Sequence, residues 1–194
     1  MPQTLNLLLK SSILTKQKTL VIEPEFMEFN NINLSKFEIA AIRCGVKGIK
    51  GYKFWIGRIY CIDIKSVDGT VIKIRLKSLY GIRRKKLGEK YKLILAVLFE
   101  NFVNDICQSF IAEFNNKVDL DLLGTTFTPE GIILNKIDKL IYWSDVGTKN
   151  YWHYFSIFSI SDPNINASFY YLSDWNTIVL YNLVKNILMS GKSE

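Results

Sequence analysis

The chain has 194 residues, of which 48% are hydrophobic, 22% charged and 13% aromatic. This balance suits one globular domain or two small ones, and it excludes a disordered, collagen-like or coiled-coil chain. No apolar run approaches the ~18–20 residues of a bilayer-spanning helix, so we expect no transmembrane segment and a soluble, cytoplasmic protein.

The first half of the chain is typical of a series of strands. The expected strands cover residues 19–22, 26–29, 37–49, 52–66 and 71–78. A hairpin turn at Val67-Asp68-Gly69 precedes the last strand, because Asp-Gly tolerates the positive φ of tight primed turns. In that strand Lys73, Arg75 and Lys77 alternate with apolar residues, which predicts a half-buried strand with a basic outer face.

Helices are expected at the end of each half. A charged connector, Arg83-Arg84-Lys85-Lys86, leads to a long helix over 89–114, whose apolar residues recur at steps of three and four. The strands expected in the second half cover 122–128, 132–134, 139–146, 151–161 and 167–172. A helix over 175–189 follows them.

The two halves can be laid over each other. Residues 20–29 fall opposite 125–134 at an offset of 105, which aligns Pro24-Glu25 with Pro129-Glu130. Residues 37–42 then fall opposite 141–146 at an offset of 104. The shared order of elements predicts an internal duplication.

A known family shows a similar pattern. The Thr128-Pro129-Glu130-Gly131 turn between two strands, followed by Ile141-Tyr142-Trp143-Ser144-Asp145-Val146, resembles bacterial pleckstrin-homology-like (PH-like) domains. The resemblance covers about residues 17–191 as a tandem of two diverged copies. It implies an α+β fold with two small bent antiparallel sheets or partly open barrels, each capped by a C-terminal helix. We therefore expect an N-terminal segment (1–16), a basic first domain (17–117) and an acidic second domain (118–194).

The resemblance implies a binding scaffold and not an enzyme, and we expect no catalytic residue, no metal site and no cofactor. Members of this superfamily bind phosphoinositides, peptides or protein surfaces, so the first hypothesis is an adaptor that recognises a protein partner. Partner binding through a free sheet edge that takes an added strand, and homodimerisation through the first long helix, are further alternatives. The candidate docking residues are the crowded aromatic residues Tyr151, Trp152, Tyr154, Tyr170 and Tyr171.

Charge is unevenly distributed along the chain. Residues 1–118 carry 20 Lys and Arg against 10 Asp and Glu, whereas residues 119–194 carry 5 against 8. The basic half indicates an alternative function, the binding of a polyanion, either acidic membrane lipid or nucleic acid. The candidate anion-binding residues are Lys47, Lys50, Lys53, Lys73, Arg75, Lys77, Arg83, Arg84, Lys85 and Lys86. The resemblance places the first three of these in the family's first, inositide-binding hairpin, although the [Lys/Arg]-x-Arg pattern that usually follows is absent.

The remaining reactive side chains fit ordinary structural roles. Cys44, Cys61 and Cys107 are odd in number and form no C-x-x-C pair, so we expect buried, reduced thiols. His153 is the only histidine, and it lies in a strand-like aromatic run. A catalytic pairing of His153 with a cysteine is the alternative to an ordinary sheet histidine.

Overall fold

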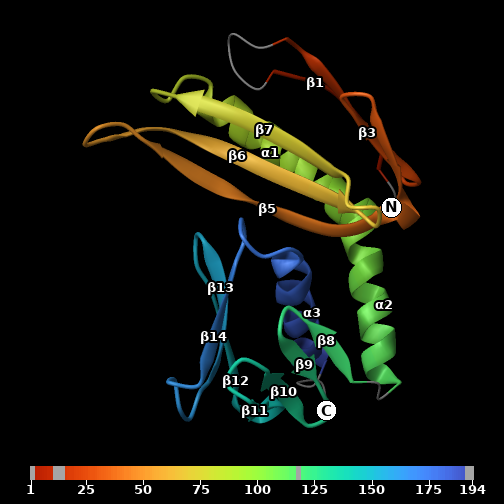
Figure 1. Cartoon of the computed structure of the whole chain (residues 1–194), viewed down its shortest axis with the longest axis vertical. Helices are drawn as coiled ribbons and strands as arrows, with labels where there is room; N and C mark the ends of the chain where they lie inside the picture. Colours follow the sequence, from red (N-terminus) through yellow and green to blue (C-terminus); the bar gives the residue numbers. More distant parts are fainter. Residues whose placement is uncertain (1–2, 11–15, 117–118, 191–194) are drawn as a thin grey trace. The chain divides into compact units, whose positions relative to one another are not determined.

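The computed structural model describes residues 3–10, 16–116 and 119–190 (Figure 1). The fold is mixed α+β, with four small antiparallel sheets and a C-terminal helix. None of the sheets formed by these residues closes into a barrel, and each half contains two sheets where one bent sheet was expected. The chain divides into two compact units, Met1–Asn104 and Asp105–Glu194, which are described separately. The boundary expected at residues 117 and 118 lies outside the described residues.

Unit 1 begins with two antiparallel sheets. The first has the strand order β1 (Leu5–Leu9), β2 (Lys18–Ile22), β3 (Phe26–Phe29) and β4 (Ile32–Ser35). A 3₁₀ turn, η1 (Lys36–Glu38), leads to the second sheet, made of β5 (Ile39–Lys50), β6 (Trp55–Ser66) and β7 (Val71–Leu79). Strand β1 comes from the N-terminal segment that the sequence assigned to no domain, and it pairs with β2 throughout its length. The first sheet is therefore larger than expected.

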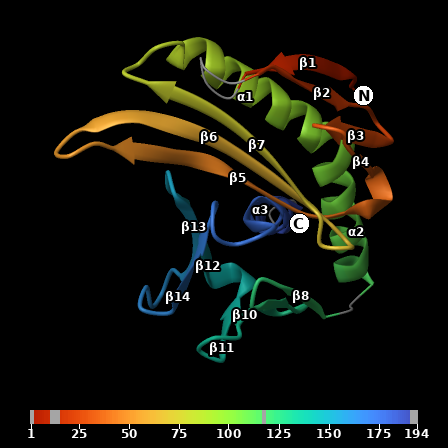
Figure 2. The ribbon, with the colours of Figure 1, turned by 45° about the horizontal axis from the view of Figure 1, so that its top comes forward.

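One face of the β5–β6–β7 sheet forms much of the core of unit 1. The side chains of Ile62, Ile64, Ile72, Ile74 and Leu76 are almost fully buried. The helix α1 (Arg84–Leu98) lies along this sheet (Figure 2), and the rings of Tyr60 and Tyr91 meet at 5.2 Å between centroids. The alternation predicted for β7 is confirmed, because Ile72, Ile74 and Leu76 are buried while Lys73 and Lys77 are exposed.

The helical segment begins earlier than the sequence indicated. It starts at Arg84, so most of the expected charged connector forms the first turn of α1. A π-helical turn, η2 (Phe99–Val103), joins α1 to α2 (Asn104–Asn115). Within this turn the buried Asn101 side chain accepts a hydrogen bond from the Gln3 backbone N–H and donates one to the Gln3 carbonyl. The irregular turn thus has a structural role, which is to hold the start of the chain beside the helix.

The segment Arg84–Asn115 is the one helix in the described part of the chain that is long and apolar enough to cross a membrane. This is weak evidence for a membrane span, because the core helix of a soluble protein has the same length and composition. Several of its apolar side chains are buried inside the protein, among them Ile94, Leu98 and Phe102.

Unit 2 has the same succession of elements. Its first sheet contains β8 (Leu120–Leu122), β9 (Thr125–Phe127), β10 (Gly131–Leu134) and β11 (Lys139–Tyr142). The 3₁₀ turn η3 (Trp143–Asp145) leads to the sheet of β12 (Val146–Asn150), β13 (Tyr154–Ser159) and β14 (Asn166–Tyr170), and α3 (Thr177–Ser190) follows. Its core includes Phe127, Phe155, Val179, Leu180 and Leu183, which are fully buried.

Equivalent hydrogen bonds support the internal duplication. The Glu23 N–H donates to the Phe26 carbonyl at 2.8 Å, and at an offset of 105 the Thr128 N–H donates to Gly131 at 2.9 Å. Further along, the bonds from Lys36 N–H to Glu25 and from Trp143 N–H to Glu130 correspond. The offset between the two halves is 107 at the 3₁₀ turns η1 and η3. It is larger here because the β10–β11 connection is two residues longer than the β3–β4 connection. The expected offset of 104 for this segment is therefore wrong by three residues.

Candidate functional site: an aromatic and basic surface on unit 1

The connection between β5 and β6 lies at one end of the sheet (Figure 1). Tyr52 is 94% exposed and Trp55 73% exposed, and Phe54 is exposed to a similar degree. Lys50 and Lys53 are exposed in the same hairpin, and the Lys53 ammonium lies 5.4 Å from the centre of the Tyr52 ring. The hairpin therefore combines apolar rings with positive charge in a stretch of six residues.

Two glycines fix the shape of this hairpin. A Cβ at Gly48 would lie 2.2 Å from Trp55 Cζ3, so the Trp55 ring packs directly against the glycine backbone. The Gly51 N–H donates to the Phe54 carbonyl at 2.7 Å and closes the turn. Any side chain at Gly48 would displace the Trp55 ring, and the exposed ring is thus held in place by the neighbouring strand.

The β7–α1 turn lies at the same end of the sheet. The Tyr80 N–H donates to the Ile56 carbonyl at 2.7 Å, which ties the turn to the start of β6. Tyr80 and Ile82 are exposed, and Tyr80, Gly81 and Arg83 have positive φ angles of 49°, 75° and 59°. We call the whole surface the aromatic–basic tip; it consists of Lys50, Tyr52, Lys53, Phe54, Trp55, Tyr80, Ile82, Arg83, Arg84, Lys85 and Lys86.

The positive charge at the start of α1 is electrostatically unfavourable. Arg84, Lys85 and Lys86 occupy the first turn, which contains no acidic residue, and Arg83 at the N-cap makes no side-chain capping bond. The macrodipole places partial positive charge at a helix N-terminus, so cations there lower the stability of the helix. An anion bound at this end of the unit would relieve that repulsion.

A hollow of about 250 Å³ lies between the hairpin and the turn. It is lined on one side by Trp55 and Arg58 and on the other by Tyr80, Gly81 and Arg84. The Arg58 and Arg84 guanidinium groups have no ion-pair partner among the described residues. The hollow is therefore positively charged.

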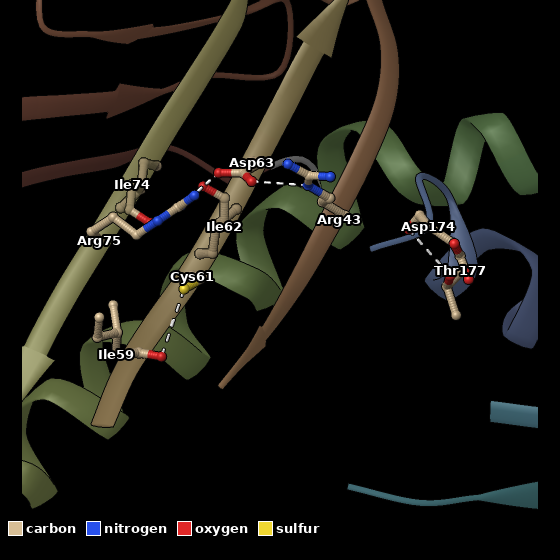
Figure 3. Close-up of polar contacts among 9 residues, drawn as sticks. All are labelled: Arg43, Ile59, Cys61, Ile62, Asp63, Ile74, Arg75, Asp174 and Thr177. Carbon is tan, nitrogen blue, oxygen red and sulfur yellow. Dashed lines mark hydrogen bonds and ion pairs between the residues drawn. The ribbon is translucent and has the colours of Figure 1, made fainter. Parts of the chain in front are cut away.

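The remaining anion-binding candidates lie on the face of the β5–β6–β7 sheet that points away from α1. Lys47 and Lys77 are both exposed and flank Ile59 in the strand register, and Lys73 is exposed further along β7. Arg75 differs, because its guanidinium lies 2.5 Å from the buried Asp63 carboxylate (Figure 3) and donates to the Ile62 and Ile74 carbonyls.

Asp63 also forms an ion pair with Arg43 of the neighbouring strand β5. The Arg43 Nε donates to Asp63 Oδ2 at 2.9 Å, so one buried carboxylate joins β5, β6 and β7 (Figure 3). Neither Arg43 nor Asp63 was expected from the sequence to have a special role, although the strand register makes them direct neighbours. Arg75 is therefore a structural residue in this ion-pair cluster, whereas Lys47, Lys73 and Lys77 extend the positive surface.

The expectation that Lys47, Lys50 and Lys53 lie in the first hairpin of the domain is wrong. Lys47, Lys50 and Lys53 lie on or between β5 and β6, the fifth and sixth strands of the unit, and not in its first hairpin. The first antiparallel pair of strands in the unit is β1 with β2, and no strand was expected at β1. The comparison with the family's inositide-binding pattern therefore does not apply to these residues.

Unit 2 brings together three of the five aromatic docking candidates. Tyr151 stacks on Tyr154 at 4.5 Å between centroids, and Tyr154 lies 5.5 Å from Tyr170. We call these three rings the tyrosine ladder. Trp152 is exposed next to the ladder at the β12–β13 turn, whereas Tyr171 is buried and its hydroxyl donates to Asn150 Oδ1.

The cysteines are free and buried, as predicted. Burial raises the pKa of the Cys44 and Cys107 thiols to about 11 and raises that of Cys61 as well. His153 is exposed in the β12–β13 turn beside Trp152. The described residues contain no group of three or more His, Cys, Asp or Glu side chains that could hold a metal ion.

Comparison with protein-family models, with curated proteins and with solved structures finds no match for this chain. The surfaces of the two units are therefore the features that point to its function. The most distinctive of them is the aromatic–basic tip.

Proposed function

We propose that this chain is a non-enzymatic binding protein that attaches to anionic membranes through the aromatic–basic tip of unit 1. One observation carries the proposal: large apolar side chains and cations are exposed together at one end of the sheet. Tyr and Trp are favoured at the membrane–water interface, and basic residues are attracted to acidic headgroups. We interpret the chain as a tandem of two PH-like copies, a scaffold in which antiparallel strands and a C-terminal helix present such loops.

The shape of the tip favours a membrane over a nucleic acid. Single-stranded nucleic acid is usually held in a positively charged groove along which successive bases stack. Here Tyr52 and Phe54 stand at the end of a turn, and Ile82 adds an aliphatic side chain that offers no stacking surface. Lys50 and Lys53 are exposed in the same hairpin as these rings, where they would meet phosphate groups at the membrane surface.

The proposal is tested by co-sedimentation of the full chain with vesicles of phosphatidylcholine alone and with 30% phosphatidylserine, at low and physiological salt. We expect binding only to the anionic vesicles, and a Phe54→Ser, Trp55→Ser variant should bind at least about tenfold more weakly, because each ring adds apolar burial. Tyr142→Ser is the matched control, since this exposed ring lies in unit 2. Equal binding of the variant and the wild type, or binding to single-stranded DNA in preference to vesicles, would contradict the proposal.

The tyrosine ladder of unit 2 favours a second function, the binding of a protein partner. Rows of partly exposed tyrosines are frequent at protein interfaces because each ring supplies contact area at a small entropic cost. A variant with Tyr151, Tyr154 and Tyr170 changed to Ser should lose partner proteins that the wild-type chain retains in a pull-down. Retention of the same proteins by both would exclude the ladder as the docking surface.

A further inference from the structure

The sheet of unit 2 ends in a strand whose outer edge lies in a hollow. Among the residues that the structure describes, β14 pairs with β13 alone. A cavity of about 570 Å³ is lined by all five residues of β14, by Asp174, and by the turns that contain Leu123–Gly124 and Lys136–Ile137. This volume lies within the range of sites that bind ligands.

One short stretch of the β14 backbone has N–H and C=O groups that point away from β13 and are available for hydrogen bonds. At its end the Tyr170 N–H donates to Asp174 Oδ2 at 2.7 Å, and the Tyr170 carbonyl accepts from the Asp174 N–H at 2.9 Å. Both Tyr170 groups therefore point away from β13. Backbone groups point to the same side at every second residue of an antiparallel strand, so the N–H and C=O groups of Ser168 and Asn166 also face outward.

We infer that the open edge at Asn166–Ser168 binds an extended peptide of a partner protein, which adds to the sheet as a fourth strand. The outward groups of Ser168 and Asn166 can make up to four backbone hydrogen bonds with such a strand. This mode of recognition combines main-chain bonds, which give affinity, with side-chain pockets, which give specificity. The inference concerns a surface on unit 2 and is independent of membrane attachment by unit 1.

The walls of the hollow indicate the chemistry of the peptide. Leu123, Leu134 and Ile137 provide apolar surface, and the Lys136 ammonium has no ion-pair partner among the described residues. A peptide with apolar side chains and one acidic residue placed opposite Lys136 complements these walls. Asp174 closes the edge at Tyr170 and thereby limits the added strand to a short segment.

A second copy of the chain fits this edge less well. The open stretch is three residues long, or about 7–10 Å of strand. Stable protein–protein interfaces bury about 1,200–2,000 Å², and a folded sheet cannot enter a hollow of this volume. An extended segment can enter it and contact the walls on both sides.

The experiment begins with a library of random nine-residue peptides displayed on phage and selected on the immobilised full chain. The enriched peptides are synthesised, and their affinity is measured by fluorescence anisotropy for the wild type and three variants: Ser168→Pro, Lys136→Glu and Leu8→Pro. Proline at Ser168 removes an outward N–H without breaking a bond to β13. Leu8 is the matched control, because it lies on the edge strand of the other unit, where its carbonyl accepts from the Lys90 ammonium and so also faces outward.

We expect enriched peptides to carry an acidic residue among apolar ones, and Ser168→Pro and Lys136→Glu to weaken their binding at least about tenfold. Leu8→Pro should leave the affinity unchanged, and exchange of the Ser168 amide hydrogen should slow when peptide is added. Lys136→Glu tests the inference even if Ser168→Pro fails to fold. Absence of enrichment, or equal binding by wild type and Lys136→Glu, would overturn it. Protection of the Ser168 amide that increases with protein concentration would overturn it in favour of a second copy.

Discussion

Removal of the positive charge at the start of α1 should weaken membrane binding and at the same time stabilise the fold. The perturbation is a variant with Arg83, Arg84, Lys85 and Lys86 all changed to Gln. These residues lie at the N-cap and in the first turn of the helix, where no acidic residue balances them. If these residues only stabilised the fold, their substitution would not weaken membrane binding and raise stability at the same time.

The magnitudes follow from helix geometry. Each basic residue near an anionic leaflet contributes about 1 kcal/mol, but successive helical residues point about 100° apart. Two or three of the four cations can therefore face the membrane together, and their removal should weaken binding about 30- to 150-fold. The three cations within the first turn each oppose the macrodipole by about 0.3–1 kcal/mol at low salt. The free energy of unfolding should then rise by about 1–3 kcal/mol.

The assays are vesicle co-sedimentation and urea unfolding followed by circular dichroism, both at low salt. The control for net charge removes four lysines from unit 2: Lys136, Lys139, Lys149 and Lys185. This control should bind anionic vesicles as the wild type does. Equal loss of binding in both variants would show that net charge alone is responsible, and a fall in the stability of the first variant would refute the argument from the helix dipole.

Three further predictions concern the interior of the protein. Asp63→Asn should lower the free energy of unfolding by about 2–4 kcal/mol, because it leaves two arginines without their buried partner; urea denaturation measures this, and an unchanged midpoint would contradict it. Cys44 and Cys107 should react slowly with iodoacetamide at pH 8, since both thiols are buried and stay protonated below their pKa of about 11; rapid labelling of the folded chain would disprove the described burial. Gly131→Ala should destabilise unit 2 by about 1–3 kcal/mol, because a Cβ there would lie 2.1 Å from the Ile141 carbonyl oxygen; thermal unfolding tests this, and an unchanged melting temperature would argue against the close approach.

Strands with regular alternation could be predicted from the sequence, whereas the turns between them could not. From Ile72 to Lys77 the apolar and basic residues of β7 alternate, and the strand occurs at 71–79, one residue longer than expected. The expected strand at 122–128 is instead a hairpin, because Leu123 and Gly124 adopt positive φ angles of 56° and 73°. Leucine rarely adopts this conformation, so local propensity gives no sign of the turn.

The cations of the aromatic–basic tip could be found from composition, but the exposure of its aromatic residues could not be predicted. Tyr52, Phe54 and Trp55 have high strand propensity, and the sequence analysis therefore placed them inside a strand. Their exposure depends on where the β5–β6 turn falls, and that is fixed by the pairing of Lys50 with Trp55. Tyr80 is exposed because it lies at the start of a turn with positive φ, which no pattern in the sequence indicated.

The duplicated hairpins provide an internal comparison for the membrane proposal. Lys50 pairs with Trp55 in unit 1, and Asn150 pairs with Phe155 in unit 2, at an offset of 100. The closing bonds also correspond, since the Tyr151 N–H donates to the Tyr154 carbonyl as Gly51 does to Phe54. Both hairpins therefore expose aromatic rings, but Lys50 and Lys53 of the first are replaced by Asn150 and His153 in the second.

This difference makes the exchange of two residues a direct test. A Lys50→Asn, Lys53→His variant keeps the exposed rings and should bind anionic vesicles about 10- to 30-fold more weakly at pH 8, where the histidine is neutral. The reciprocal Asn150→Lys, His153→Lys variant keeps all cations of unit 1 and should bind at least as strongly as the wild type. Lowering the pH to 5.5 should restore part of the binding of the first variant, because its new histidine becomes protonated. If the first variant binds as well as the wild type at pH 8, the hairpin lysines do not contact the membrane, and attachment must depend on the rings and the cations of α1 alone.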